Sequence, residues 1–186
     1  MESTALSLSN IVRAIRLIAS SSPRYGTLFV NTGCNRRCIY CVVPEQGSGV
    51  ELGSAEWCRI IDKLHGWGVR LGNILGGEPT LRQDLPEIIA HASTKMAVNL
   101  TSNGDTFVGP KGRDRLTTLA SRGLSLLNLS LHDLGETNRQ LDLLAYAKSL
   151  GVIPILATVV TKATIGRLPD IMIEATQRGI LSRYSF

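Results

Sequence analysis

The sequence predicts an α/β fold, a partial TIM-type (β/α)6 barrel with parallel strands and an incomplete last unit. Six apolar strand segments alternate with helical segments at intervals of roughly thirty residues, which is the pattern of repeated βα units. Several strand segments are nearly continuous apolar runs, as expected when both faces of a parallel sheet are covered. A closed barrel of eight units needs about 250 residues, whereas this chain has 186.

Two regions are expected along the chain. Residues 1–24 are predicted to form an opening helix and a linker, and residues 25–186 are predicted to form the partial-barrel core. The opening helix is indicated by apolar residues at helical spacing, namely Leu8, Ile11, Val12, Ile15 and Ile18. Ser20–Pro23 then breaks the helical pattern.

The predicted strands are short apolar runs that end in glycine or polar residues. They span Thr27–Val30, Val69–Leu75, Ala97–Thr101, Leu124–Leu131, Val152–Val160 and Leu181–Phe186. Between them, helices are predicted around Leu85–Ala92, Arg113–Ser121, Glu136–Leu150 and Leu168–Gln177. A further helix is expected to start with Ser54 as its N-cap and to carry Trp57, Ile60, Ile61 and Leu64 on one face.

Three cysteines follow the first predicted strand at a C-x3-C-x2-C spacing, at Cys34, Cys38 and Cys41. A 4Fe–4S cluster takes four thiolates, so three thiolates on one loop can hold three irons and leave the fourth open. Nothing in the sequence indicates secretion, and clustered cysteines in a reducing compartment are more often metal ligands than disulfides. Cys58 lies apart on a predicted helix and is expected to be a buried or half-buried thiol.

A second motif, Gly76-Gly77-Glu78-Pro79, follows the second predicted strand. Together with the cysteine motif, which carries Tyr40 just before its third cysteine, it resembles the radical S-adenosylmethionine (radical SAM) superfamily. The residues of both motifs are most similar to those of the branch that contains the molybdenum-cofactor biosynthesis enzymes and the peptide-maturing enzymes. The resemblance covers nearly all of residues 27–186.

The resemblance implies a 4Fe–4S cluster ligated by Cys34, Cys38 and Cys41, with SAM chelating the open iron. It also implies contacts to SAM from Tyr40, Gly76, Gly77, Glu78, Asn103 and Ser130. The implied reaction is reductive cleavage of SAM to a 5′-deoxyadenosyl radical, which abstracts hydrogen from a substrate. The substrate is left open between a peptide, a nucleotide-derived cofactor precursor and RNA.

The charge of the chain permits partners without identifying them. The net charge of +5 and the pI of about 9.3 are mildly basic, so nucleic acid is not indicated. Arg36 and Arg37 are candidates to dock an acidic electron donor such as a flavodoxin or ferredoxin, or else are solvated loop arginines. No apolar run is long enough for a membrane span, and a cytoplasmic location is expected. A partner chain is one way to complete the barrel.

Two other classes of function stay open from the residues. One is an accessory or truncated subunit that holds a cluster without cleaving SAM. The other is a zinc-stabilised domain, in which His65, Cys58 or His91 would supply the fourth ligand. Four more polar residues follow strand ends and are expected to face the cavity, although none is assigned a catalytic role: Asp105, His132, Asp133 and Lys162.

Overall fold

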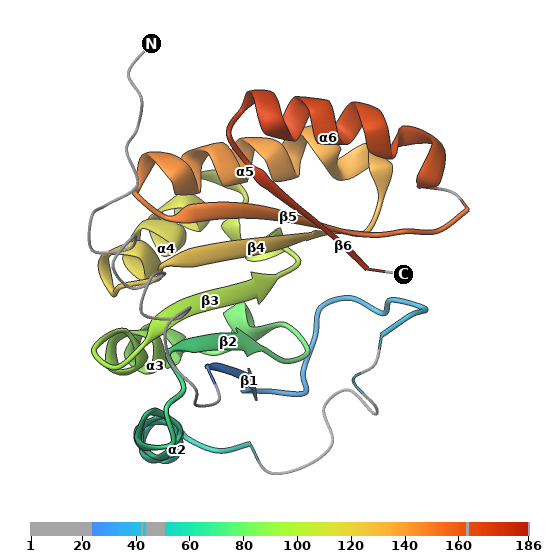
Figure 1. Cartoon of the computed structure of the whole chain (residues 1–186). Helices are drawn as coiled ribbons and strands as arrows, with labels where there is room; N and C mark the ends of the chain where they lie inside the picture. The colour runs from blue at the N-terminus through green and yellow to red at the C-terminus, as the bar shows by residue number, and fades with distance from the viewer. Residues whose placement is uncertain (1–23, 42, 44–50, 163, 186) are drawn as a thin grey trace.

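The computed structural model describes residues 24–41, 43, 51–162 and 164–185 (Figure 1). Its centre is a parallel sheet of six strands in the order β1-β2-β3-β4-β5-β6. The strands are β1 (Tyr25–Phe29), β2 (Leu71–Leu75), β3 (Ala97–Ser102), β4 (Leu126–Leu131), β5 (Ile153–Val159) and β6 (Leu181–Ser185). Each strand therefore pairs with its neighbours in sequence, as in a barrel, and the predicted partial (β/α)6 barrel is confirmed.

Helices connect the strands and follow one another along one side of the sheet, while the cysteine segment lies at the carboxyl ends of the strands (Figure 1). The α-helices are α2 (Ser54–Gly66), α3 (Leu85–Ser93), α4 (Gly109–Ser121), α5 (Thr137–Ser149) and α6 (Leu168–Gln177). Short 3-10 turns are η1 (Pro79–Leu81), η2 (Asp105–Phe107), η3 (Leu134–Glu136) and η4 (Ile165–Arg167). None of the helices described is both long and apolar enough to span a bilayer.

The core lies between the sheet and the helices. Alternate residues of the strands point towards the helices, and Leu100, Leu127 and Leu129 are fully buried there. Side chains at the intervening positions lie on the other face of the sheet and include a polar row. In this row Asn99 Nδ2 donates to Asn73 Oδ1 at 2.6 Å, and Thr101 Oγ1 donates to the same oxygen at 3.0 Å. The inner face of the sheet is thus partly polar, which suits a binding cavity.

The main corrections to the predicted boundaries concern helix starts. Gly53, and not Ser54, is the N-cap of α2, because the Glu56 carboxylate accepts a hydrogen bond from the Gly53 N–H at 2.9 Å. Helix α4 starts at Gly109 instead of Arg113, with Pro110 in its first turn. The predicted apolar face of α2 is confirmed, with Trp57 and Ile61 buried in the core.

The strand boundaries shift by a few residues. Strand β1 covers Tyr25–Phe29 and not Thr27–Val30, because it pairs in register with β2 from Tyr25 opposite Leu71. Strand β6 runs alongside β5 as the predicted sixth strand. The predicted opening helix falls within residues 1–23, which lie outside the described residues.

Candidate functional site

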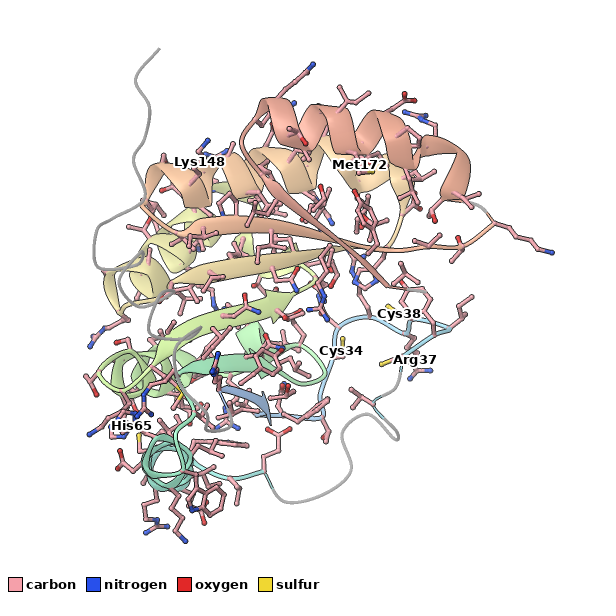
Figure 2. The ribbon with its side chains drawn as sticks, viewed as in Figure 1. Cys34, Arg37, Cys38, His65, Lys148 and Met172 are labelled. Carbon is pink, nitrogen blue, oxygen red and sulfur yellow. The ribbon has the colours of Figure 1, made fainter. Side chains whose placement is uncertain are left out.

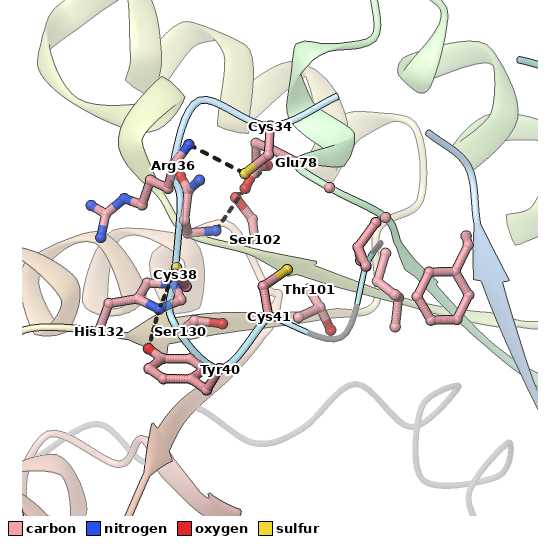
Figure 3. Close-up of a pocket in the computed structure, with 16 residues that line it drawn as sticks. Cys34, Arg36, Cys38, Tyr40, Cys41, Glu78, Thr101, Ser102, Ser130 and His132 are labelled. Atoms are coloured by element: carbon pink, nitrogen blue, oxygen red, sulfur yellow. Dashed lines mark hydrogen bonds between the residues drawn. The ribbon is translucent and has the colours of Figure 1, made fainter. Parts of the chain in front are cut away.

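The cysteine loop, residues 31–41, closes one side of a cavity of about 300 Å³ at the carboxyl ends of β1 to β4 (Figure 3). All nine residues that the resemblance assigned to the cluster and SAM line this cavity: Cys34, Cys38, Tyr40, Cys41, Gly76, Gly77, Glu78, Asn103 and Ser130. They come from four segments far apart in sequence. The fold therefore gathers the predicted site residues around a single space.

The three thiols of the loop are unbridged. The Arg36 N–H donates to Cys34 Sγ at 3.3 Å, and Cys38 Sγ lies 3.5 Å from His132 Nδ1. Burial raises the pKa of the Cys38 thiol, and the negative charges of Cys34 and Cys41 raise it further. Three thiolates crowded in this way repel one another. A bound group that carries positive iron offsets that repulsion, so the donor set fits an iron–sulfur cluster.

The side chains proposed as a fourth zinc ligand lie elsewhere in the fold. His91 Nε2 lies 3.0 Å from Asp62 Oδ1, and Arg70 Nη1 lies 3.3 Å from His65 Nδ1. Figure 2 shows His65 on α2, well away from Cys34 and Cys38. Cys58 is a half-buried thiol on the same helix, as predicted. Within the described residues, no three His, Cys, Asp or Glu side chains converge as they would around a single metal ion.

The two glycines of the second motif let the cysteine loop lie against the turn after β2. A Cβ atom on Gly77 would collide with the carbonyl oxygens of Gly33 and Thr32, and one on Gly76 would collide with Asn31. The loop is also hydrogen-bonded there, because the Gly77 N–H donates to Asn31 O at 2.9 Å and the Glu78 N–H donates to Gly33 O at 2.8 Å. The family resemblance implied contacts from these glycines to SAM, and their close packing against the cysteine loop is a second reason for glycine at both positions.

Glu78 is 1% exposed, and both oxygens of its carboxylate accept hydrogen bonds from the protein. Oε1 accepts hydrogen bonds from the Thr80 N–H at 3.0 Å, the Thr80 hydroxyl at 2.5 Å and the Ser102 hydroxyl at 2.9 Å. Oε2 accepts from the Asn103 N–H at 2.8 Å. A buried carboxylate is stable only when it is hydrogen-bonded in this way. Glu78 therefore ties the turn after β2 to the end of β3.

Both the nitrogen and the oxygen of the Asn103 side-chain amide form hydrogen bonds within the protein. Its Nδ2 donates to Asn35 Oδ1 at 2.7 Å, and its Oδ1 accepts from the Asp105 N–H at 2.9 Å. Asn35 Nδ2 in turn donates to Asp105 Oδ2 at 3.0 Å. Asn103 thus lines the cavity while it joins the cysteine loop to the turn after β3.

Arg36 points inwards and is paired within the protein, which fits neither of the two alternatives predicted for it, a docking residue or a solvated loop arginine. Its guanidinium group binds the carboxylates of Asp105 and Glu136, at 2.5 Å and 2.7 Å from Nη2. These carboxylates raise the pKa of Arg36, and Arg36 lowers the pKa of Asp105 through its hydrogen bonds. Arg37, by contrast, is exposed.

Tyr40 and His132 face each other at the rim of the cavity (Figure 3). The Tyr40 hydroxyl lies 2.6 Å from His132 Nδ1, and the two rings stack with centroids 6.0 Å apart and an angle of 14° between planes. Burial lowers the pKa of His132. His132 lines the cavity, as expected.

The other three polar residues that were expected to face the cavity, Asp105, Asp133 and Lys162, are not among the residues that line it. Asp105 is bound to Arg36. The Asp133 carboxylate caps the η3 turn by accepting from the Gly135 N–H at 2.7 Å. Exposed Lys162 and Asp133 line a neighbouring hollow beside Ile39 and Leu134.

The sequence alone did not predict that Arg36 pairs with Glu136 at this site.

The segment that forms this cavity matches a known protein family. The model of the Radical SAM superfamily matches residues 28–161, which carry both motifs. The chain therefore belongs to the radical SAM superfamily. The family uses a 4Fe–4S cluster together with SAM, which agrees with the donor set gathered at the cavity.

Curated relatives support the branch suggested by the motifs. The chain is 31% identical over 154 residues to a PqqA peptide cyclase of Rhodopseudomonas palustris, covering 75% of this chain and 40% of that protein. It is 34% identical over 159 residues to a probable GTP 3′,8-cyclase of Methanopyrus kandleri, covering 78% of this chain and 50% of that protein. The chain thus spans half or less of the length of these two relatives.

Solved structures share the fold. SuiB of Streptococcus suis, bound to the precursor peptide SuiA, matches 95% of this chain and 43% of its own with a TM-score of 0.70 and 22% identity. Methylornithine synthase (PylB) matches the whole chain and 60% of its own with a TM-score of 0.68 and 13% identity. At these identities the likeness supports the fold alone.

Proposed function

We propose that this chain is the core of a radical SAM enzyme, with Cys34, Cys38 and Cys41 as the ligands of a 4Fe–4S cluster. The observation that carries the proposal is the shared cavity, which both family motifs line. A bound and reduced cluster would supply the one-electron reduction that cleaves SAM to methionine and a 5′-deoxyadenosyl radical, the species that would abstract hydrogen from a substrate.

The chain contributes binding and orientation. We assign the methionyl end of SAM to the backbone at Gly76 and Gly77, where the turn after β2 faces the cavity. Glu78 holds this turn in place through its four hydrogen bonds. Tyr40 and Ser130, which also line the cavity, are assigned to the adenosine end.

The substrate is assigned to a second hollow of about 410 Å³ that adjoins the first. Tyr40, Thr101, Ser130 and His132 line both spaces, so a molecule in one lies against a molecule in the other. The second hollow also carries Arg183, a cation that suits an anionic group of the substrate. The named relatives include a peptide cyclase and a GTP cyclase, so a peptide and a nucleotide are both to be tried.

We propose that the electron that reduces the cluster comes from an acidic donor protein, such as a flavodoxin or ferredoxin, in the cytoplasm. Two residues of the cysteine loop support this docking site. Arg37 is exposed, and Ile39, between Cys38 and Tyr40, is completely exposed. A cation beside an apolar side chain suits a transient contact with an acidic protein surface.

The test is anaerobic reconstitution with iron and sulfide, followed by dithionite and SAM, with 5′-deoxyadenosine measured by chromatography. We expect a brown protein that forms 5′-deoxyadenosine, and loss of both properties in Cys38→Ala. Cys58→Ala is the matched control, because this thiol lies on α2 outside the cavity. A brown protein that forms no 5′-deoxyadenosine would indicate an accessory subunit. A colourless protein that binds zinc would contradict the proposal.

A further inference from the structure

Arg36 forms the centre of an ion-pair cluster that reaches from the cysteine loop to two other loops. Its Nε donates to Asp105 Oδ2 at 2.7 Å and its Nη1 donates to Glu136 Oε2 at 3.0 Å, while Nη2 binds the second oxygen of each carboxylate. Both carboxylates are thus bound in the two-point geometry that makes arginine pairs strong and directional. We call these three side chains the Arg36 clamp.

The Arg36 clamp is partly shielded from water. The side chains of Arg36, Asp105 and Glu136 are 18%, 25% and 22% exposed. Ion pairs that are partly withdrawn from solvent are screened less than surface pairs, so their geometry is held more firmly. Arg139 Nη2 also lies 3.2 Å from Asp105 and 3.0 Å from Glu136, which balances the two negative charges with two positive ones.

The clamp joins segments that are remote in sequence. Asp105 is 69 residues from Arg36 and begins the η2 turn after β3, whereas Glu136 is 100 residues away and ends the η3 turn after β4. Arg36 lies between Cys34 and Cys38. The segment 34–38 is therefore fixed to the carboxyl ends of two adjacent strands of the sheet.

The backbone of Arg36 reaches a candidate ligand directly, because its N–H donates to Cys34 Sγ at 3.3 Å. Fixing the side chain of Arg36 also fixes this N–H over the sulfur. Hydrogen bonds to ligand sulfurs are among the features that set the properties of iron–sulfur clusters. Arg36 also lines the cavity, and its guanidinium group is bound to Asp105 and Glu136, so the clamp acts on the Cys34 ligand through the position of the loop.

The clamp is also continuous with Glu78. Asn35 donates to Asp105 at 3.0 Å, Asn103 donates to Asn35 at 2.7 Å, and the Asn103 N–H donates to the Glu78 carboxylate at 2.8 Å. One chain of hydrogen bonds therefore runs from the turn that carries Gly76 and Gly77 to the cysteine loop. The two halves of the cavity wall are held in one arrangement.

We propose that Arg36 is a positioning residue, whose clamp to Asp105 and Glu136 pre-orients Cys34 and Cys38 for the cluster. The inference rests on the proposed function. Ligand-orienting groups outside the coordination sphere typically change metal affinity by about 10–100-fold when removed. We expect an effect of that size on retention of the cluster when Arg36 is replaced.

The experiment compares reconstituted Arg36→Ala with the unchanged protein, first for the rate at which a chelator removes iron. We expect iron to be lost about 10–100-fold faster from Arg36→Ala. The electron paramagnetic resonance spectrum of the reduced cluster should also shift, because the hydrogen bond to Cys34 Sγ is no longer fixed. Arg36→Lys keeps the charge but cannot form two forked pairs, so we expect it to restore retention in part.

Arg178→Ala is the matched control. Arg178 also binds two carboxylates, Asp142 at 2.8 Å and Glu174 at 2.7 Å, but it follows α6 and lies outside the cavity. Arg178→Ala also removes pairs to two carboxylates, but it does not reach the cysteine loop, so we expect unchanged iron loss and an unchanged spectrum.

The outcomes separate the two proposals. If the unchanged protein binds no cluster, the proposed function fails. If it binds a cluster and forms 5′-deoxyadenosine while Arg36→Ala and Arg178→Ala lose iron at the same rate with the same spectrum, only the positioning role fails.

Discussion

The Glu78 carboxylate is a buried charge whose stability depends on four neighbouring donors. Three of them are provided by Thr80 and Ser102, and the fourth is the Asn103 N–H. Each hydrogen bond to a charged group contributes more than a neutral pair does. Because these donors belong to two different loops, Glu78 couples the folding of the loops as well as their positions.

Replacing Glu78 with glutamine should destabilise the protein by about 2–3 kcal/mol, because an amide nitrogen would face donors that now bind oxygen. Urea unfolding monitored by circular dichroism measures this free energy. Glu87→Gln is the control, since Glu87 is exposed on α3 and its replacement should change stability by less than about 0.5 kcal/mol. Equal free energies of unfolding for the two variants would contradict the role given to Glu78.

The stabilisation from Asp105 should depend on pH. Arg36 lowers the pKa of this carboxyl in the folded protein, so the unfolded chain binds a proton more readily than the folded one does. The contribution of Asp105 is therefore complete above about pH 4, the ordinary range of an aspartate, and is lost as the pH falls through the lowered folded pKa.

This pH dependence can be measured with Asp105→Asn, which cannot titrate. The unchanged protein should be more stable than the variant at pH 7, and the difference should shrink at about pH 3. Urea unfolding at both pH values gives the two differences. A difference that stays constant with pH would show that Asp105 does not contribute through its charge.

At the scale of elements, the turn after β2 and the cysteine loop form one packed unit. The backbone of the loop passes so close to Gly76 and Gly77 that no side chain fits between them. Asn31 holds the same contact from the other side, because its Nδ2 donates to Gly33 O at 3.0 Å and to Glu78 O at 2.9 Å. The two motifs recognised in the sequence are therefore in direct contact.

Gly77→Ala should destabilise the protein by about 1–3 kcal/mol, because the added methyl group meets backbone oxygens that cannot move aside easily. It should also weaken cluster binding, since the loop must shift. Gly66→Ala is the control, because a Cβ atom there meets nothing within 4 Å at the end of α2. In a helix this exchange is neutral or stabilising by up to about 1 kcal/mol. A Gly77→Ala protein as stable as Gly66→Ala would refute the packing argument.

The sequence predicted the order of elements and the residues that line the cavity, but not the contacts that hold the cavity wall together. Strand and helix patterns are local, and the cysteine and glycine motifs are short, so both can be recognised in one stretch. The partners of Arg36 lie 69 and 100 residues away in loops, and no local pattern indicates such a contact. Arg36 and Arg37 are adjacent and alike in sequence, yet only the fold decides that one turns inwards.

At the scale of the molecule, the sheet is built from pairs of successive strands. Among the described residues, β3 and β4 each pair on both sides, whereas β1 and β6 each pair on one side. Backbone amides in central strands open only when larger parts of the structure unfold. The sheet should therefore be least stable at its two margins.

Hydrogen–deuterium exchange of this chain should show the slowest amides in β3 and β4 and faster exchange in β1 and β6. Comparison of exchange rates with those of an unfolded chain of the same sequence removes the local sequence effect. If amides of β6 were as protected as those of β3, a further stabilising contact along β6 would be required.

The order of the strands also has a consequence for synthesis on the ribosome. Because each strand pairs with the one made just before it, the sheet can assemble from its first strand onwards as the chain emerges. The cysteines appear early, but the carboxylates that hold Arg36 belong to positions 105 and 136. In a nascent chain the thiols are thus exposed before Arg36 can pair with Asp105 and Glu136. We expect the cluster to be inserted stably only after β4 and the turn that follows it have left the exit tunnel.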